Sequence, residues 1–195
     1  MNTHFAKQAR KRLLTNQQLL LVTGSMLGDG YLVKTTSGFA FRVNHGLAQK
    51  DYVNWKHRLL ADFVNSEPRR SGNTYYFRTI THQKFSDLQE QFYVNHVKVI
   101  PKNLIKAMIN PFMLAVWIMD DGSKDGRQIR INTQCFSFEE HVFLQNVLRA
   151  KLGIVTTLNH DKKQLRLRVS EKSMDNLRNM VMHYIIPSML YKLIP

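Results

Sequence analysis

The chain contains two copies of one apolar segment that ends in an acidic residue followed by glycine. Leu19–Gly30 reads LLLVTGSMLGDG and Phe112–Gly122 reads FMLAVWIMDDG, so Asp29 and Asp121 occupy the same position in the two copies. Each copy is an apolar run of helical length. A chain that carries such a unit twice is expected to fold as two similar halves, because a sequence repeat reports a repeat of structure.

Shorter matches follow the two copies in the same order along the chain. FRVN at Phe41–Asn44 matches IRIN at Ile129–Asn132, and KVIP at Lys98–Pro101 matches KLIP at Lys192–Pro195. No stretch rich in Pro, Gly or Ser separates the copies. We therefore expect an N-terminal half over 1–107 and a C-terminal half over 108–195.

Hydrophobic periodicity predicts the same succession of elements in both halves. Alternation of apolar and polar residues indicates strands, each with one buried face, at 39–44, 128–132 and 164–170. Helical spacing is found at 51–63, 84–94, 138–152 and 173–184. Each half thus reads helix, strands, helix, strands, helix, which predicts an α/β protein of the α+β type.

The charge of the chain points to a polyanionic partner. Lys and Arg number 28 against 14 Asp and Glu, which gives a net charge of +14 and a pI near 10.1. Such an excess of positive charge favours nucleic acid as the partner, and a basic enzyme that binds no nucleic acid is the alternative.

Several protein classes are excluded by composition. The longest strongly apolar run, Phe112–Met119, is too short to span a bilayer, and we expect no membrane partner and no signal peptide. The single cysteine, Cys135, forms no internal disulfide and makes no zinc site alone. These features predict an intracellular protein in a reducing compartment.

The paired acidic ends of the two apolar segments suggest a metal site. Gly24 and Gly28 lie four residues apart on one helical face, where a second helix can approach closely. Two such helices side by side would place Asp29 and Asp121 at the same end, among carbonyl groups with a negative dipole. An oxygen-rich pocket of this kind suits Mg²⁺, and metal ions there can assist hydrolysis of a phosphodiester.

Other interpretations of these residues remain open. A single Gly-Asp-Gly after a helix is commonly a C-cap and turn. Asp121, Ser123, Asp125 and Gly126 follow the start of a calcium-binding loop, but Asn132 stands where such a loop needs a bidentate glutamate. The histidines show no metal-ligand spacing, and His45 is one of them. Cys135 is interpreted as a packing residue.

Several segments resemble one known family. VTGSMLGDG at Val22–Gly30 and LAVWIMDDG at Leu114–Gly122 are similar to the two signature motifs of the LAGLIDADG homing endonucleases, in the single-chain group encoded in group I introns. GDGYL at Gly28–Leu32, NTQCFSFEE at Asn132–Glu140 and PSMLYKLIP at Pro187–Pro195 also look like that group. The resemblance covers nearly the whole chain.

The resemblance implies a fold and a site. It implies two pseudo-twofold-related αββαββα halves whose antiparallel sheets form a DNA-binding saddle, in a monomer that cuts both strands of a long asymmetric target. The metal-binding carboxylates fall on Asp29 and Asp121, with Mg²⁺ as the cofactor and Mn²⁺ as a substitute. Lys98 and Lys192 match the basic catalytic residues. Asn44 and Asn132 match the polar strand residues that help to hold metal or water.

Residues on the polar strand faces are the candidates for DNA contacts, because Arg and Gln suit guanine and adenine edges. They are Arg42, Arg78, Gln128, Arg130, Gln134, Arg166 and Arg168. Lys7, Arg10, Lys11 and Arg12 are expected to form either a mobile arm that contacts phosphate or a solvated arm. Val116 and Asp120 depart from the family pattern, and Asp120 is a candidate helix cap.

Two other functions compete with the endonuclease. A maturase would use the same fold to bind intron RNA and assist splicing, without needing both carboxylates. A DNA-binding regulator would lack catalysis. The sequence leaves open whether the compartment is a mitochondrion, a chloroplast, or the cytoplasm of a bacterium or of a phage-infected cell.

Overall fold

The computed structural model describes residues 3–161 and 164–194, and the side chain of Asp161 is outside this description. Pro195, the last residue of the KLIP match, is also outside it. The chain divides into two compact units, 1–91 and 92–195. The expected division of the repeat at 107/108 stays a prediction, because compactness and sequence similarity are different criteria. No helix in the described ranges is long and apolar enough to cross a membrane.

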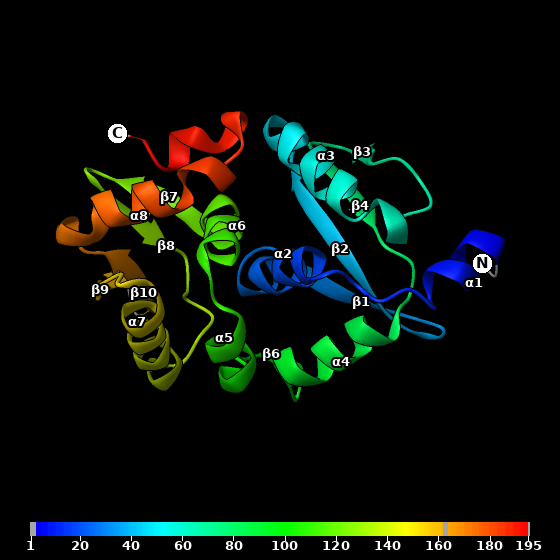
Figure 1. Ribbon diagram of the computed structural model, residues 1–195, viewed down its shortest axis with the longest axis horizontal. Helices are drawn as coiled ribbons and strands as arrows, with labels where there is room; N and C mark the ends of the chain where they lie inside the picture. The colour runs from blue at the N-terminus through cyan, green and yellow to red at the C-terminus, as the bar shows by residue number, and fades with distance from the viewer. Residues whose placement is uncertain (1–2, 162–163, 195) are drawn as a thin grey trace. The chain divides into compact units, whose positions relative to one another are not determined.

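The first unit contains four strands and four α-helices among its described residues (Figure 1). In chain order they are α1 (His4–Ala9), α2 (Asn16–Leu27), β1 (Tyr31–Thr35), β2 (Gly38–Gly46), α3 (Lys50–Leu59), β3 (Arg69–Ser71), β4 (Thr74–Arg78) and α4 (Gln83–Phe92). Short 3₁₀ turns precede and follow α3 at Leu47–Gln49 and Ala61–Phe63. The strands form one antiparallel sheet in the order β1-β2-β4-β3.

The second unit repeats this succession after a short hairpin and an extra helix. Its elements are β5 (Tyr93–Val94), β6 (Val97–Lys98), α5 (Lys102–Met108), α6 (Pro111–Asp121), β7 (Gly122–Asp125), β8 (Gln128–Ile131), α7 (Phe138–Leu152), β9 (Thr156–Asp161), β10 (Gln164–Val169) and α8 (Met174–Val181). Three 3₁₀ segments, Glu171–Ser173, Met182–Tyr184 and Pro187–Lys192, flank or follow α8. The sheet order β7-β8-β10-β9 matches that of the first unit. The predicted αββαββα topology is therefore confirmed in both units.

The two motif helices, α2 and α6, begin with side-chain caps and are buried along most of their length. Thr15 and Gln18 form a capping box at the start of α2. The Asn110 side chain accepts a hydrogen bond from the Met113 N–H at the start of α6. Such caps satisfy N–H groups that have no partner within the helix, so each motif helix has a defined first residue.

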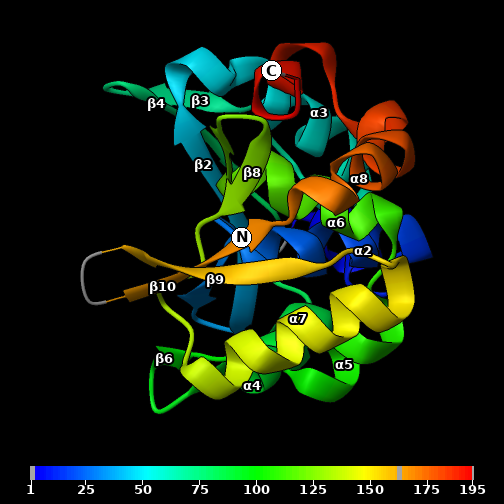
Figure 2. The same cartoon turned by 90° about the vertical axis from the view of Figure 1, so that its left-hand side faces the viewer.

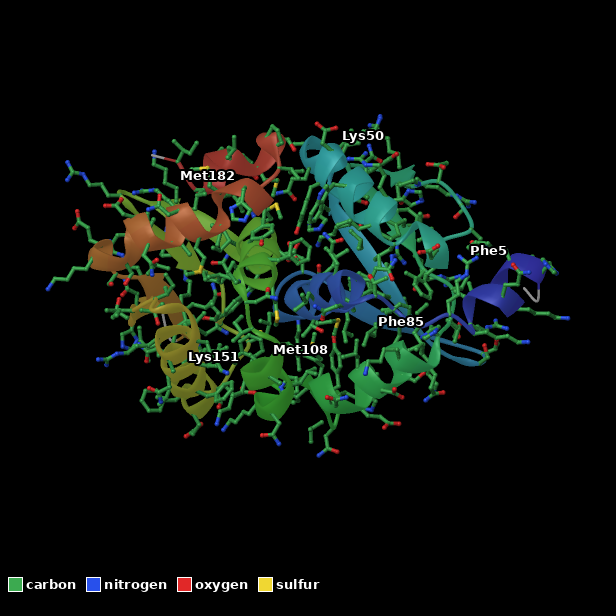
Figure 3. All side chains as sticks on the ribbon, viewed as in Figure 1. Phe5, Lys50, Phe85, Met108, Lys151 and Met182 are labelled. Carbon is green, nitrogen blue, oxygen red and sulfur yellow. The ribbon has the colours of Figure 1, made fainter. Side chains whose placement is uncertain are left out.

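Alternation along the strands separates an apolar face from a polar face in the first sheet. Phe41 and Phe77 are buried, whereas their neighbour Arg42 is half-buried on the other face. Phe85, which comes from α4 and is labelled in Figure 3, packs 6.3 Å from Phe41 between ring centres. The ring centre of His57, on α3, lies 5.3 Å from that of Phe77. Helices α3 and α4 thus cover the apolar face, and the polar face is left for other contacts.

The second sheet has the same division of faces. Ile129, Ile131, Leu167 and Val169 are buried, while Arg130 and Arg168 are half-buried. Helix α7 runs along the strands β9 and β10 (Figure 2). The predicted helix at 138–152 has these same bounds in the structure. The helices expected at 51–63 and 173–184 are shorter, because 3₁₀ turns occupy part of each range.

The N-terminal basic segment includes a docked helix and is not a detached arm, although Lys7, Lys11 and Arg12 are exposed to solvent as the alternative expected. Ala6 and Ala9 of α1 are buried against Phe63 and Ile80. Arg12 Nη1 lies 2.8 Å from Asp62 Oδ1, and its carbonyl oxygen is 2.9 Å from His82 Nε2. Small apolar residues in α1 allow this packing, which a count of its positive charges does not reveal.

Candidate active site

Asp29 lies on a tight turn that follows α2. The Gly30 N–H donates to the Ser25 carbonyl at 2.8 Å, so the chain folds back on the end of the helix. A Cβ at Gly30 would lie 2.8 Å from Ser25 Cβ and 2.9 Å from Phe41 Cε2, which no side chain tolerates without movement. Glycine at this position lets the turn close, and the Asp29 side chain remains 49% exposed at the helix end.

His45, which the sequence interpretation set aside for lack of metal-ligand spacing, lies beside Asp29. Its Nδ1 lies 3.6 Å from Asp29 Oδ2, and the ring is buried and 5.1 Å from the Tyr52 ring. Spacing rules for metal ligands miss it because Asp29 and His45 belong to different elements. The register of the strands could have indicated this proximity, because β2 runs antiparallel to β1 and returns beside the turn that carries Asp29.

Asn44 lies in the same register. Tyr31 pairs with Arg42, and continuing that antiparallel register by two residues places Asn44 opposite Asp29. The Asn44 side chain is half-buried and its Oδ1 has no hydrogen-bond partner within the described residues. A buried amide oxygen without a donor is costly unless it binds a cation or water, so this atom fits the predicted role in holding metal or water.

The second unit places Asp121 at the corresponding position. Asp121 is the last residue of α6, and a Cβ at Gly122 would lie 2.5 Å from the Ile118 carbonyl oxygen. The Asn132 N–H donates to the Asp121 carbonyl at 3.1 Å, and Arg166 Nη1 lies 3.5 Å from Asn132 Oδ1. Each motif aspartate therefore has an asparagine beside it, Asn44 within β2 in the first unit and Asn132 directly after β8 in the second.

Lys192 occupies the C-terminal end of α6. Its ammonium is buried and donates to the carbonyl oxygens of Met119 and Asp120 at 2.6 and 2.7 Å. A cation here satisfies carbonyls that the helix leaves without partners and opposes the negative end of the helix dipole. Asp120, the candidate cap in the sequence, is itself buried, and its carbonyl oxygen is held by Lys192.

Lys98 has a different environment from Lys192, although their sequence contexts match. It is half-buried on β6, paired with Tyr93, and belongs to the second compact unit. Partial burial raises the pKa of the Cys135 thiol, Lys98 lowers it and Asp121 raises it. Burial, and then Cys135, raises the pKa of Tyr93. Cys135 is exposed, which corrects its interpretation as a packing residue.

The polar face of the first sheet carries two of the predicted DNA-contacting arginines side by side. Arg42 pairs directly with Arg78 across β2 and β4, and its guanidinium lies 4.6 Å from the centre of the Tyr76 ring. A cavity of about 640 Å³ opens at this end of the sheet, and four of its lining residues are Arg10, Arg42, Arg69 and Arg78. This concentration of guanidinium groups suits a polyanion.

The polar face of the second sheet holds the other predicted residues. Arg130 pairs directly with Arg168 across β8 and β10. Gln128 Nε2 donates to the Val169 carbonyl at 2.8 Å, so its amide is bound to the neighbouring strand. Arg166 lies beside Asn132, and Gln134 is half-buried in the loop after β8. The structure shows where these residues lie on the sheet, whereas their contacts with DNA stay predictions.

The comparisons with known proteins agree with the motifs and with the fold. Residues 20–177 match the model of the LAGLIDADG DNA endonuclease family. The chain belongs to this family. The resemblance stated from the sequence is therefore confirmed.

The similar curated proteins have two kinds of name. Cytochrome b mRNA maturase bI2 of Saccharomyces cerevisiae is 33% identical over 90% of this chain, which spans 47%, about half, of that protein's length. The maturase bI2 of Debaryomyces hansenii is 32% identical, over 92% of this chain and 74% of that protein. Probable intron-encoded endonuclease 1 of Wickerhamomyces canadensis is 29% identical, over 99% of this chain and 91% of that protein.

Solved structures of the family share the fold. The homing endonuclease I-WcaI bound to its DNA recognition sequence superposes with a TM-score of 0.89 at 29% identity, over 99% of this chain and 93% of that one. I-DmoI in complex with DNA and Mn gives a TM-score of 0.56 at 13% identity, over 86% of this chain and 97% of that one, which is a likeness of fold alone.

Proposed function

We propose that this LAGLIDADG protein is a sequence-specific endonuclease that hydrolyses phosphodiester bonds on both strands of a long, asymmetric DNA target and thereby promotes intron mobility. One observation carries the proposal. In both units, a motif aspartate at a helix end lies beside an asparagine that stands in or directly after the second strand of a sheet, and the polar face of that sheet presents paired arginines. The structural relative I-WcaI, at 29% identity, is bound to its DNA recognition sequence.

The oxygen atoms of each motif aspartate and of the asparagine beside it suit a hard divalent cation. Carboxylate and amide oxygens of Asp29 with Asn44, and of Asp121 with Asn132, are the ligands that Mg²⁺ prefers, and Mn²⁺ accepts them too. A divalent ion bound there would polarise the scissile phosphate and activate water. The aspartates supply the negative charge that holds the ion, and the asparagines orient water without adding charge.

The two lysines act in different ways in this proposal. Lys98 is half-buried, and its charge acts on the same Cys135 thiol as the charge of Asp121, so we assign Lys98 to the stabilisation of negative charge that develops on the phosphate. Lys192 contributes by holding the end of α6 through the Met119 and Asp120 carbonyls. It is therefore a positioning residue for Asp121.

DNA recognition is assigned to the polar strand faces. The Arg42–Arg78 and Arg130–Arg168 pairs present guanidinium groups that suit guanine edges and phosphates. The net charge of +14 favours binding to the DNA backbone at low salt. We assign a monomer to this function, and a compartment inside the cell, either an organelle or the cytoplasm of a bacterium or of a phage-infected cell.

The test is cleavage of DNA selected from a long randomised pool in Mg²⁺, with Ca²⁺ as the comparison. Asp29→Asn and Asp121→Asn should each lower double-strand cleavage by more than about 100-fold while DNA binding changes little, because the negative charge that holds the metal is lost and the strand faces are kept. Asp175→Asn is the matched control, since its side chain is 94% exposed on α8. Full double-strand cleavage by either motif variant would disprove the proposal.

A maturase is the second candidate, and the names of two relatives favour it. An RNA-binding role does not need the carboxylates. The Asp29→Asn, Asp121→Asn double variant should then bind intron RNA tightly and restore splicing. Binding of RNA without any DNA cleavage by the unaltered chain would place this function first. Sequence-specific DNA binding with neither activity would identify a regulator.

A further inference from the structure

One acidic residue stands among the arginines on the polar face of the second sheet. Asp125, the last residue of β7, has its Oδ2 3.0 Å from Arg168 Nε and 3.6 Å from Arg130 Nε. The three side chains are 28–34% exposed, so water screens these ion pairs less than it screens fully exposed ones.

The contacts of Asp125 restrain the two arginines without using all of their donors. Arg130 and Arg168 are direct cross-strand partners, and like charges in that position repel each other. A carboxylate between them removes this penalty and favours one arrangement of both side chains. Both ion-pair distances are measured to Nε, which forms no hydrogen bond among the described residues, so these ion pairs use none of the five N–H donors of either guanidinium. The pair is thus oriented by Asp125 while it keeps donors for a ligand.

The first sheet has no acidic residue at the position equivalent to Asp125. Tyr31, Arg42 and Arg78 form the row that corresponds to Ser123, Arg130 and Arg168. Val33 pairs with Ala40 as Asp125 pairs with Gln128, so valine stands where the second sheet has aspartate.

Aromatic rings take the place of the acid in the first sheet. Arg42 lies over the rings of Tyr76 and Tyr31, at 4.6 and 5.9 Å. Among the described residues, no carboxylate lies within 4.0 Å of the Arg42 or Arg78 guanidinium nitrogens. The two arginine pairs therefore share a register and differ in how they are held.

We propose that Asp125 is a positioning residue that determines base specificity in the second half of the DNA target. This rests on the proposed function. A fixed guanidinium presents a bidentate fork to guanine, whereas an unrestrained one also reaches phosphates and other bases. The carboxylate also repels phosphate, so a badly fitted DNA binds less well.

The experiment compares the full chain, Asp125→Asn and Glu90→Gln in Ca²⁺. Duplexes bound from a randomised pool are sequenced, and affinity for the selected and a scrambled duplex is measured against salt. Asp125→Asn should lose about tenfold discrimination or more at one to three adjacent base pairs, the effect of one bidentate contact. Its affinity for the scrambled duplex should rise. Glu90→Gln, an exposed charge change on α4, should alter neither.

A second variant tests the same idea in the other sheet. Val33→Asp places a carboxylate in the register position opposite Ala40, next to the Arg42–Arg78 row. It should change base preference in the other half of the target and lower affinity for the scrambled duplex. This result does not depend on the stability of Asp125→Asn.

The outcomes separate the two proposals. If the unaltered chain enriches no DNA sequence, the proposed function fails. If it enriches a sequence and folded Asp125→Asn keeps the same preference at every base pair, the role of Asp125 is overturned. Should Asp125→Asn not fold, an unchanged preference in Val33→Asp overturns it.

Discussion

The ammonium of Lys192 donates a hydrogen bond of 2.7 Å to the carbonyl oxygen of Asp120, the residue that precedes the motif carboxylate Asp121. A second bond of 2.6 Å reaches the Met119 carbonyl. The C-terminal 3₁₀ segment is thereby attached to the end of α6. Lys192 thus supports the local backbone that presents Asp121, and its effect on cleavage is coupled to its effect on folding.

Lys192→Met should destabilise the chain and impair cleavage together. Two buried carbonyls would lose a charged donor, which costs about 1–3 kcal/mol of unfolding free energy. Lys98→Met, at a half-buried strand position, should impair cleavage with little change in stability. Urea unfolding and cleavage of the selected DNA by both variants separate these effects. A Lys192→Met variant with unchanged stability would contradict the capping role.

Lys192→Arg distinguishes a role of Lys192 in positioning Asp121 from a role of its positive charge alone. A guanidinium keeps the positive charge, but its planar fork does not fit the space of an ammonium between two carbonyls. We expect cleavage to fall in parallel with stability. Direct catalysis by Lys192 would instead give a loss of cleavage at unchanged stability.

Arg10 should contribute to DNA affinity without contributing to sequence preference. It lines the cavity that also contains Arg42, Arg69 and Arg78, on a segment held in place by α1. Arg10→Ala should weaken binding to all duplexes by a similar factor and reduce the salt dependence by about one ion. Lys151→Ala, an exposed charge change on α7, is the control. A change in base preference in Arg10→Ala would show direct readout instead.

The topology could be predicted from the sequence because it depends on local patterns. The repeat of the motif, the alternation in 164–170 and the helical spacing of 138–152 each report on a single element. The position of Asn44 beside Asp29 follows from the same patterns once the hairpin register is known.

Contacts between elements could not be predicted in the same way. KVIP and KLIP look equivalent, yet Lys98 pairs on a strand and Lys192 is buried at a helix end. The docking of α1 depends on Ala6 and Ala9 fitting against Phe63, which is a matter of packing between distant segments. Alternation shows that Arg130 faces outward, but only the cross-strand register brings Asp125 to it.

Cys135 should react slowly with thiol reagents at neutral pH, and its modification should block cleavage. Partial burial of the thiol, with Asp121 as a further cause, raises the pKa of Cys135, and Lys98 only partly opposes this. Because the thiolate is the reactive form, the rate should rise with pH, with a midpoint above that of free cysteine. Iodoacetamide labelling across a pH series measures it.

The adduct at Cys135 introduces bulk close to Lys98 and Asp121, so labelled protein should lose cleavage. Cys135→Ser should cleave normally and be insensitive to the reagent, which assigns the effect to this thiol. A reaction midpoint at or below that of free cysteine would contradict the raised pKa, and full cleavage by the labelled chain would place the thiol away from the reacting groups.

Glu140 should link the stability of α7 to the position of Lys98. One carboxylate oxygen accepts from the Ile100 N–H and the other accepts from the Ser137 N–H at 2.7 Å, so the start of α7 is joined to the segment that follows β6. Glu140→Ala leaves two N–H groups without this acceptor and should cost about 1–3 kcal/mol. It should also lower cleavage more than DNA binding, because Lys98 lies two residues before Ile100.

Glu139→Gln is the matched comparison for Glu140→Ala, because its carboxylate is exposed beside the same helix start. Bonds from its own N–H and from Ser137 lower the pKa of Glu139 below its usual value. A lowered pKa stabilises the fold above the usual carboxyl pKa, and this contribution is lost as the pH falls through the folded-state value. The stability difference between Glu139→Gln and the unaltered chain should therefore be small at pH 7 and vanish in acid.

Chemical unfolding from pH 7 down to acid, with cleavage measured at pH 7, tests both positions. A Glu140→Ala variant as stable as Glu139→Gln at pH 7 would show that the carboxylate bridge to Ile100 does not hold this segment.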